Sequence, residues 1–170
     1  MRIALVFAFF LCFAIAVSAI AAPAQFSALV IAVADGDTIT VLTQDKQQAK
    51  IRLYGIDCPE SKQAFGNRAK QVTADAVHGK NVTVQPMEQD RYGRTVAVVF
   101  TPGGQSLCEH LVREGMAWVY TKYCKLKDIC EPLRKLENVA RKQRNGLWAD
   151  KAPMPPWEWR KRGIAEFKTH

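Results

Sequence analysis

The sequence has few of the residues from which histidine metal centres are built. Only three histidines occur, His78, His110 and His170, and they stand far apart in the chain. We therefore expect no histidine-based metal site and assign each of them a surface or structural role. The chain also lacks an internal repeat and a low-complexity linker, so a length of 170 residues favours one domain.

Acidic residues are scarce beside basic ones. The chain has 16 Asp and Glu against 24 Lys and Arg, which gives a net charge of +8. Such an excess raises the local concentration of anions and favours nucleic acid or an anionic surface as the partner. A solvated basic surface that serves only solubility is the alternative.

Long apolar runs are missing except at the N-terminus. After Met1 and Arg2, residues 3–20 are almost wholly apolar, and several alanines follow. This order is typical of a secretory signal peptide, which we expect to be cleaved near Ala22. A retained anchor is the alternative, because about 18 apolar residues can just span a bilayer. After cleavage we expect a secreted or periplasmic protein without stable membrane association.

Four cysteines lie beyond the signal segment, and an even number in an exported protein indicates disulfides. They are Cys58, Cys108, Cys124 and Cys130. Of the three possible pairings, the one that closes a small loop between Cys124 and Cys130 leaves Cys58 for Cys108. A zinc site is the competing interpretation, and it is weak because no histidine flanks the Cys124–Cys130 spacing.

The hydrophobic pattern predicts five short strands and three helices. We expect strands at residues 27–34, 38–42, 49–56, 81–85 and 95–100. We expect helices at residues 61–78, 106–114 and 128–144. Capping-box patterns, Ser106-x-x-Glu109 and Asp128-x-x-Glu131, open the second and third helices. This order predicts a β-rich α+β fold, a five-stranded OB-type Greek-key barrel with three α-helices.

The predicted organisation has three parts. Residues 1–22 form the signal peptide, residues 23–150 the OB-type domain, and residues 151–170 an extension rich in proline, tryptophan and basic residues. We expect the extension to lie across the surface with its tryptophans partly buried.

Carboxylates and arginines gather in three predicted turns. The first holds Asp35 and Asp37, the second holds Asp57 and Glu60 after a strand with Arg52, and the third holds Asp90, Arg91 and Arg94. Sequential strands tend to be neighbours, so the first two turns can converge, whereas the third joins them only if the barrel closes. Each turn alone has a plainer interpretation, as a hairpin turn, a helix entry or a basic turn.

Together these groups meet the needs of phosphodiester hydrolysis. That reaction needs a water aimed at phosphorus and neutralisation of the charge that develops on the phosphoryl oxygens. Carboxylates hold a hard divalent cation through oxygen ligands, and the planar fork of arginine binds two phosphate oxygens at once. The turns therefore predict half or more of a metal-assisted phosphodiesterase site.

In order and spacing, five blocks of the sequence resemble the staphylococcal nuclease family. They are Asp35-Gly36-Asp37-Thr38, Arg52-Leu53-Tyr54-Gly55-Ile56-Asp57-Cys58-Pro59-Glu60, Asp90-Arg91-Tyr92-Gly93-Arg94, Leu111-Val112-Arg113-Glu114-Gly115-Met116-Ala117 and Gly146-Leu147-Trp148. The resemblance covers residues 28–150, and the second block is the most specific. It implies a calcium-dependent endonuclease of DNA and RNA with little sequence preference, which leaves 3′-phosphate ends.

The resemblance also implies a ligand set for Ca²⁺. Asp37 and Asp57 would be carboxylate ligands, and Cys58 would offer its backbone carbonyl. A threonine stands at the position of Cys58 in the best-known member, but the ligand atom belongs to the main chain, so the change need not abolish binding. Asp35 would lie behind the ligands without touching the metal.

Further roles follow by position from the same resemblance. Glu60 would be the general base or would orient the attacking water, and Arg52 and Arg94 would clamp the phosphate. Arg91, where the best-known member has a lysine, would contact a terminal phosphate.

Base stacking in the family uses tyrosines that follow the second helix. Here Trp118, Tyr120 and Tyr123 fill that stretch, offset from the family pattern, and Tyr123 is the best match with Tyr120 second. Stacking is tolerant of sequence, which suits single-stranded or frayed DNA and RNA as partners of a monomeric enzyme.

Two other classes of function stay open at this point. A non-catalytic OB-fold module of the cell envelope would bind nucleic acid but would lack a catalytic group, whereas this chain keeps Arg52, Glu60 and Arg94. A disulfide-bonded structural protein of the envelope would leave the carboxylate and arginine turns unexplained.

Overall fold

The computed structural model describes residues 24–168, with side chains as far as Gly163. The expected signal peptide, with its cleavage near Ala22, lies outside the described residues. Within residues 24–168, no helix combines the length and the apolarity needed to cross a membrane.

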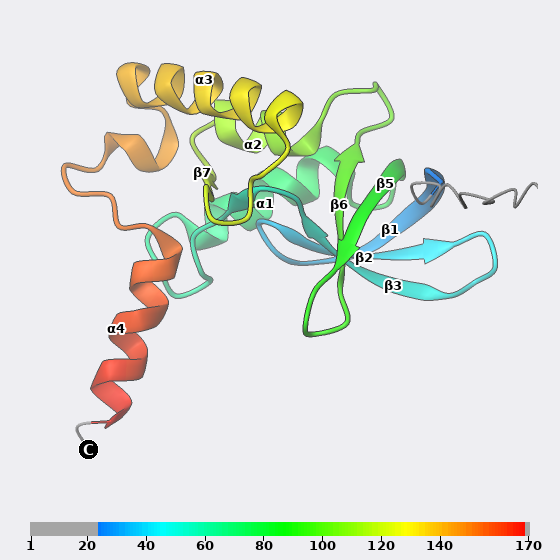
Figure 1. The fold of residues 1–170 in the computed structure, drawn as a ribbon, viewed down its shortest axis with the longest axis horizontal. Helices are drawn as coiled ribbons and strands as arrows, with labels where there is room; N and C mark the ends of the chain where they lie inside the picture. The colour runs from blue at the N-terminus through cyan, green and yellow to red at the C-terminus, as the bar shows by residue number, and fades with distance from the viewer. Residues whose placement is uncertain (1–23, 169–170) are drawn as a thin grey trace, which may run out of the picture.

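The body of the molecule is a closed five-stranded barrel (Figure 1). Its strands are β1 (Phe26–Asp35), β2 (Thr38–Thr43), β3 (Gln48–Leu53), β5 (Asn81–Gln89) and β6 (Thr95–Phe100). They close in the order β1-β2-β3-β6-β5, with β3 and β6 parallel and the other pairs antiparallel. Apolar side chains such as Val30, Ile39 and Ile51 fill the interior with no solvent exposure. The predicted β-rich barrel is confirmed.

The third predicted strand is divided by a turn at Gly55. The residues beyond it form β4 (Ile56–Asp57), which pairs with β7 (Trp118–Val119) in a separate two-stranded sheet. Gly55 has a φ of 75°, and a methyl group there would lie 2.6 Å from Cys124 Sγ, so the position requires glycine. The turn thus carries Asp57 away from the barrel strands and onto β7.

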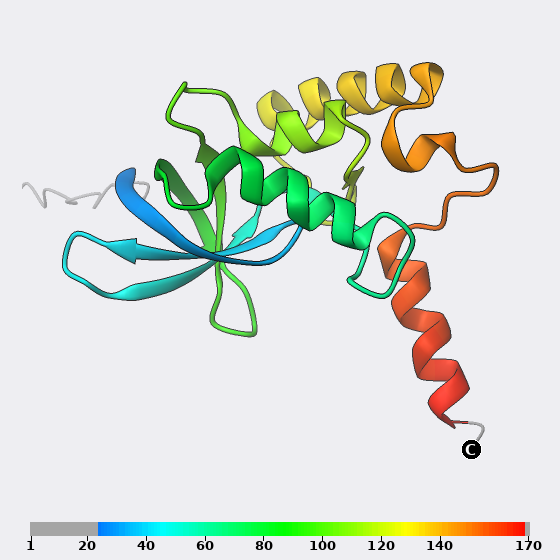
Figure 2. The same ribbon diagram turned by 180° about the vertical axis from the view of Figure 1, so that it is seen from behind.

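The three predicted helices are present, and Figures 1 and 2 show them gathered on one side of the barrel. They are α1 (Gly66–Val77), α2 (Leu107–Arg113) and α3 (Lys127–Gln143), followed by the 3₁₀ turn η1 (Gly146–Ala149). Ser106 Oγ accepts a hydrogen bond from the N–H of Glu109 at 3.4 Å, which is the cap predicted for α2. Asp128 does not cap α3, which begins one residue earlier. Ahead of that helix, the N–H groups of Lys125 and Leu126 donate to the hydroxyl of Tyr54 instead.

The C-terminal extension contains a fourth helix that the sequence did not predict, α4 (Pro156–Lys168). Pro156 is its first residue, where the missing N–H costs no helical hydrogen bond. Figures 1 and 2 agree that α4 projects from the body, with its first turns beside the loop between β4 and α1. The tryptophans of the extension differ in burial, since Trp157 is partly buried and Trp159 is 37% exposed.

One of the two expected disulfides is present. Cys124 and Cys130 are bonded, whereas Cys58 and Cys108 are free and buried. The predicted pairing of Cys58 with Cys108 is therefore wrong in this structure. The two thiols face different neighbours: a methyl group on Gly36 would lie 2.8 Å from Cys58 Sγ, while Cys108 Sγ lies 3.5 Å from the carbonyl oxygen of Tyr54.

Candidate active site

The tip of the β1–β2 hairpin is pressed against the turn that carries Asp57. Thr73 Oγ1, from α1, donates a hydrogen bond of 2.6 Å to the carbonyl of Gly36 at this tip. A methyl group on Gly36 would lie 2.7 Å from Cys58 Cβ, so the close approach requires glycine. This contact fixes Asp37 beside Asp57.

Arg52 joins the two aspartates that the sequence predicted to converge. Its Nη1 pairs with Asp37 Oδ2, and its Nη2 donates to Asp57 Oδ1 at 2.8 Å. The N–H of Cys58 also donates to Asp37 Oδ2, at 2.6 Å. Asp37 is 5% and Asp57 1% exposed, so both charges are desolvated and depend on their partners for stability.

The carboxylates are crowded enough to disturb their ionisation. Burial and the negative charge of Asp37 raise the pKa of Asp35 to about 6. Burial also raises the pKa of Asp57, against the opposing effects of Arg160 and Arg52. Three aspartates, Asp35, Asp37 and Asp57, gather around Arg52, so acidic side chains outnumber basic ones at this point.

A second arginine, Arg160 of α4, closes over the same carboxylates. Its Nη2 donates to Asp57 Oδ2 at 2.7 Å, and its Nη1 donates to Glu60 Oε1 at 2.6 Å and to Asp57 Oδ1 at 3.3 Å. Sequence reasoning missed this residue, which lies 103 positions beyond Asp57. The available signal was the basic run 160–162 next to the tryptophans of the extension.

The donor set fits a hard divalent cation that keeps several water ligands. In the described part of the chain, no group of three or more His, Cys, Asp or Glu side chains is arranged to hold a metal ion. Asp37 and Asp57 would supply two carboxylates, the backbone carbonyl of Cys58 a further oxygen, and water the rest, which suits an ion such as Ca²⁺. The surplus negative charge of the site is what such an ion would neutralise.

The β5–β6 turn, residues 90–94, keeps its arginines within itself. Arg94 Nε donates to Asp90 Oδ2 at 2.7 Å, and Arg91 Nη2 donates to the hydroxyl of Tyr92 at 2.6 Å. Closure of the barrel does bring this turn next to β3, because β6 pairs with β3 from the residue after Arg94 onward. Among the residues with described side chains, no hydrogen bond or ion pair connects Arg94 with the carboxylates around Arg52.

The predicted base-stacking tyrosines lie beside α4. The rings of Tyr120 and Tyr123 meet edge to face at 4.8 Å, and Tyr123 is 52% exposed. Trp157 of α4 stacks on Tyr120 with ring centroids 4.6 Å apart and planes inclined by 11°. Trp118 is buried against Trp148. Tyr123 is thus accessible, while one face of Tyr120 is covered by the extension.

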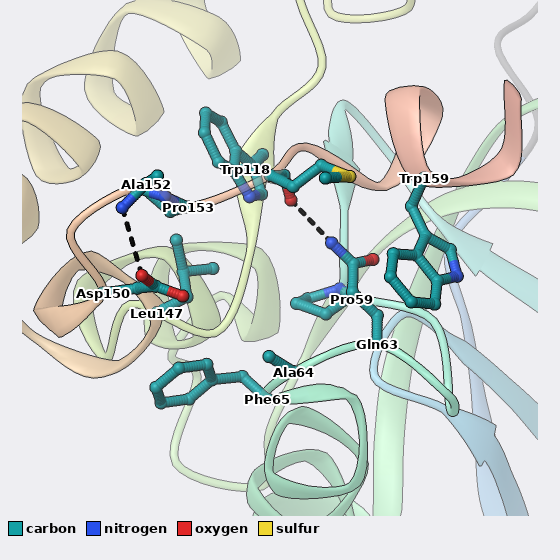
Figure 3. Close-up of a pocket in the computed structure, with 11 residues that line it drawn as sticks. Pro59, Gln63, Ala64, Phe65, Trp118, Leu147, Asp150, Ala152, Pro153 and Trp159 are labelled. Carbon is teal, nitrogen blue, oxygen red and sulfur yellow. Dashed lines mark hydrogen bonds between the residues drawn. The ribbon is translucent and has the colours of Figure 1, made fainter. Parts of the chain in front are cut away.

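A pocket of about 180 Å³ separates the extension from the loop after β4 (Figure 3). Pro59 and Gln63 line it from the loop, and Trp159 reaches toward them from α4. Gln63 Nε2 donates to the carbonyl of Met154 at 2.6 Å, which fastens the segment ahead of α4. The extension therefore rests on the loop through a few contacts around a cavity.

Comparison with known proteins connects these residues to a single family. The model described as "Staphylococcal nuclease homologue" matches residues 50–150. The chain is 44% identical over 146 residues to the micrococcal nuclease of Shigella flexneri, which covers 81% of this chain and 82% of that protein. It is 43% identical over 133 residues to an uncharacterized endonuclease of Escherichia coli O157:H7, covering 78% of this chain and 84% of that protein. Staphylococcal-like nuclease CAN1 of Arabidopsis thaliana is 43% identical over 112 residues, covering 66% of this chain and 33% of that protein.

Proposed function

Because the chain belongs to the staphylococcal nuclease family, we propose that it is an endonuclease that hydrolyses phosphodiester bonds. One observation carries the proposal. Arg52 holds Asp37 and Asp57, from two separate turns, at one buried point, and Arg160 links Asp57 to Glu60 there. An arginine between carboxylates, with a further carboxylate beside them, is the set of groups that phosphoryl transfer to water needs.

In the proposed reaction, Glu60 accepts the proton of the attacking water or orients that water toward phosphorus. Its side chain is 38% exposed, so water reaches it. Arg52, while paired with Asp37 and Asp57, stabilises the charge on the phosphoryl oxygens through its positive charge and its remaining N–H donors, and Arg94 joins it after leaving Asp90. Arg91 contacts a terminal phosphate of the substrate.

We propose Ca²⁺ as the cofactor, held by Asp37, Asp57 and the backbone carbonyl of Cys58, with Asp35 behind them. When bound, the ion would supply Lewis-acid stabilisation of negative charge on phosphate and on water-derived oxygen. The buried carboxylates and the raised pKa of Asp35, caused by burial and by Asp37, support a cation at this point.

The proposed substrates are DNA and RNA, single-stranded or frayed, cut with little sequence preference to leave 3′-phosphate ends. Relatives named as micrococcal nuclease and staphylococcal-like nuclease, together with the net charge of +8, support nucleic acid as the substrate class. Tyr123 and Tyr120 would stack on bases. The apolar run at the start of the sequence supports export, and we propose that the exported protein acts as a monomer.

A cleavage assay with matched variants tests this function. Purified protein without the signal segment is incubated with single-stranded DNA in Ca²⁺ or in a chelator. We expect cleavage in Ca²⁺ alone, and a loss of about 100-fold or more in Glu60→Gln with DNA binding nearly intact, because a positioned base contributes on that order. Glu114→Gln, an exposed carboxylate at the end of α2, is the control and should cleave normally.

The alternative function is a non-catalytic OB-fold module of the cell envelope that binds nucleic acid. It predicts DNA binding without cleavage in either condition. Full activity of Glu60→Gln would leave the endonuclease standing but would show that another group serves as the base.

A further inference from the structure

The C-terminal helix α4 touches two parts of the candidate site at once. Arg160 binds Asp57 and Glu60, and Trp157 stacks on Tyr120. We propose that α4 is an autoinhibitory strap that closes over the candidate site, and that Arg160 and a divalent cation compete for the same carboxylates. The inference rests on the proposed function, and it concerns a segment beyond residue 150, where the family match ends.

Arg160 contacts the carboxylate oxygens that the proposed reaction needs. Its guanidinium lies on both carboxylate oxygens of Asp57, at 2.7 and 3.3 Å, and on Glu60 Oε1, at 2.6 Å. Asp57 is the proposed metal ligand and Glu60 the proposed base. A carboxylate oxygen that accepts from a guanidinium has one lone pair fewer to offer a metal ion, and the arginine repels a cation of the same sign. Arg160 and the cation therefore compete for Asp57.

Trp157 lies three residues before Arg160 on the same helix. Its ring lies nearly parallel to that of Tyr120, 4.6 Å away, so it covers one face of a ring that could stack on a nucleobase. The helix thus places a guanidinium over the carboxylates and an aromatic ring over the tyrosine. The ion pairs of Arg160 and the stack of Trp157 on Tyr120 therefore both cover groups that we propose to bind the metal ion or the substrate.

Few side chains attach the strap to the body: besides the ion pairs of Arg160, Trp157 stacks on Tyr120 and meets Trp118 edge to face with ring centroids 5.7 Å apart. The segment ahead of α4 contains Pro153 and Pro155, it is fastened by the hydrogen bond from Gln63 to Met154, and a pocket of about 180 Å³ lies beneath it (Figure 3). The side chain of Arg160 is 42% exposed. Figure 1 shows the rest of α4 standing clear of the barrel and of the other helices.

Competition has a measurable consequence. If the open state is the one that binds the cation, the observed dissociation constant equals the intrinsic one divided by the open fraction. A strap closed nine times in ten therefore weakens binding about tenfold. Removal of the Arg160 contact should therefore lower the observed dissociation constant for the cation by the same factor.

The test measures Ca²⁺ binding by isothermal titration calorimetry and cleavage of single-stranded DNA on the same preparations. Arg160→Gln should bind Ca²⁺ about tenfold more tightly than the wild type, by the population argument above. Arg162→Gln removes the same charge from an exposed position of α4 two residues away, and it should bind as the wild type does. Trp157→Ala changes no charge but removes the stack on Tyr120, so it should also tighten Ca²⁺ binding.

The outcomes separate the strap from other roles. Equal Ca²⁺ affinity in wild type and Arg160→Gln overturns the strap, and so does tighter binding in Arg162→Gln of the same size, because that is a general charge effect. Weaker cleavage by Arg160→Gln at saturating Ca²⁺ with unchanged affinity also overturns it and makes Arg160 a phosphate-binding residue. Failure of the endonuclease is distinct: affinities that shift as expected without any cleavage support the strap and reject the nuclease. If no variant binds Ca²⁺, both proposals fail.

Discussion

Asp57 is held by two arginines from regions that are built in different ways. Arg52 lies on β3, between β2 and β6 of the closed barrel, and its side chain is 15% exposed. Arg160 lies on a projecting helix behind a proline-containing segment, and its side chain is 42% exposed. Arg52 cannot withdraw unless the barrel opens, whereas Arg160 can withdraw by movement of α4. The same ion-pair chemistry therefore gives a fixed counter-charge on one side of Asp57 and a removable one on the other.

The largest expected effect comes from breaking the fixed side. Arg52→Gln leaves Asp37 and Asp57 buried without their shared cation, and removal of one partner from a buried ion pair costs about 3 kcal/mol or more. We expect that loss in the free energy of unfolding, measured by urea titration at pH 7 in a chelator. Ca²⁺ should recover part of it by replacing the missing positive charge.

Arg160→Gln is the matched control for this measurement. The side chains of Arg160 and Glu60 are 42% and 38% exposed, and Asp57 keeps Arg52 as a partner, so we expect a loss within about 1 kcal/mol. Similar losses in the two variants would contradict the distinction between a fixed and a removable arginine. So would a loss below about 1 kcal/mol in Arg52→Gln.

The next largest effect is expected from reduction of the disulfide, which should lower the stability of the fold without altering the candidate site. Reduction of Cys124–Cys130, whose half-cystines are six positions apart, should cost about 2 kcal/mol by the loop-entropy argument. We expect Ca²⁺ affinity to stay unchanged, because Cys58 is free and neither half-cystine supplies a proposed ligand, although Cys124 lies against Gly55 in the turn before Asp57. Melting temperature by circular dichroism and Ca²⁺ affinity by calorimetry, each with and without reductant, measure the two effects.

The double variant Cys124→Ser, Cys130→Ser provides the control for this experiment. It lacks the observed disulfide, so reductant should alter neither its melting temperature nor its affinity for Ca²⁺. A drop in Ca²⁺ affinity on adding reductant to this variant would mean that Cys58 and Cys108 are bonded in solution, contrary to the structure.

The barrel and the position of Arg52 could be predicted from the sequence because both depend on strands that are close together in the chain. Alternating apolar residues and turn signals mark the strands, and strands that follow one another in the chain pair with each other, as β1 with β2 and β2 with β3 do. The pairing of Thr38 with Arg52 brings Asp37 beside Arg52, and the turn at Gly55 then returns Asp57 to the same arginine. Strand pairing also explains why Arg94 lies near β3, but it does not determine which carboxylate the Arg94 side chain binds.

The removable side could not be predicted in the same way. Arg160 reaches Asp57 across 103 positions through a stack of Trp157 on Tyr120, and no periodic pattern records such a contact. The proline-rich composition of residues 151–170 predicts a segment that lies across the surface, although proline is also favoured at the first position of a helix, as Pro156 is here. The pairing of Cys58 with Cys108 failed for a related reason, because the directions of two buried thiols depend on packing and not on spacing.

The smallest expected effect concerns a third arginine, Arg94, which Asp90 holds in the β5–β6 turn. Slight burial opposes the shift, but hydrogen bonds from the side chain and N–H of Arg94 and from the N–H of Tyr92 lower the pKa of Asp90. A carboxyl with a lowered pKa stabilises the fold above its ordinary pKa of about 4 and loses that contribution as the pH falls through its folded value. Asp90→Asn should therefore cost up to about 1 kcal/mol at pH 7, and the cost should shrink below pH 4 or so.

Urea unfolding of the wild type and of Asp90→Asn at a series of pH values measures the difference in their free energy of unfolding. Asp45→Asn, in the exposed β2–β3 turn, controls for the loss of one negative charge. A cost that is constant with pH would mean that Asp90 acts through its shape and not through its charge.

Asp90→Asn also bears on substrate binding, because it frees Arg94, the arginine that we propose as a phosphate clamp. If Asp90 restrains Arg94 as Glu60 restrains Arg160, then Asp90→Asn should lower the KM for single-stranded DNA while leaving Ca²⁺ affinity as it is. A raised KM would instead mean that Asp90 positions Arg94 for the substrate, and the β5–β6 turn would then resemble the fixed side of the site and not the removable one.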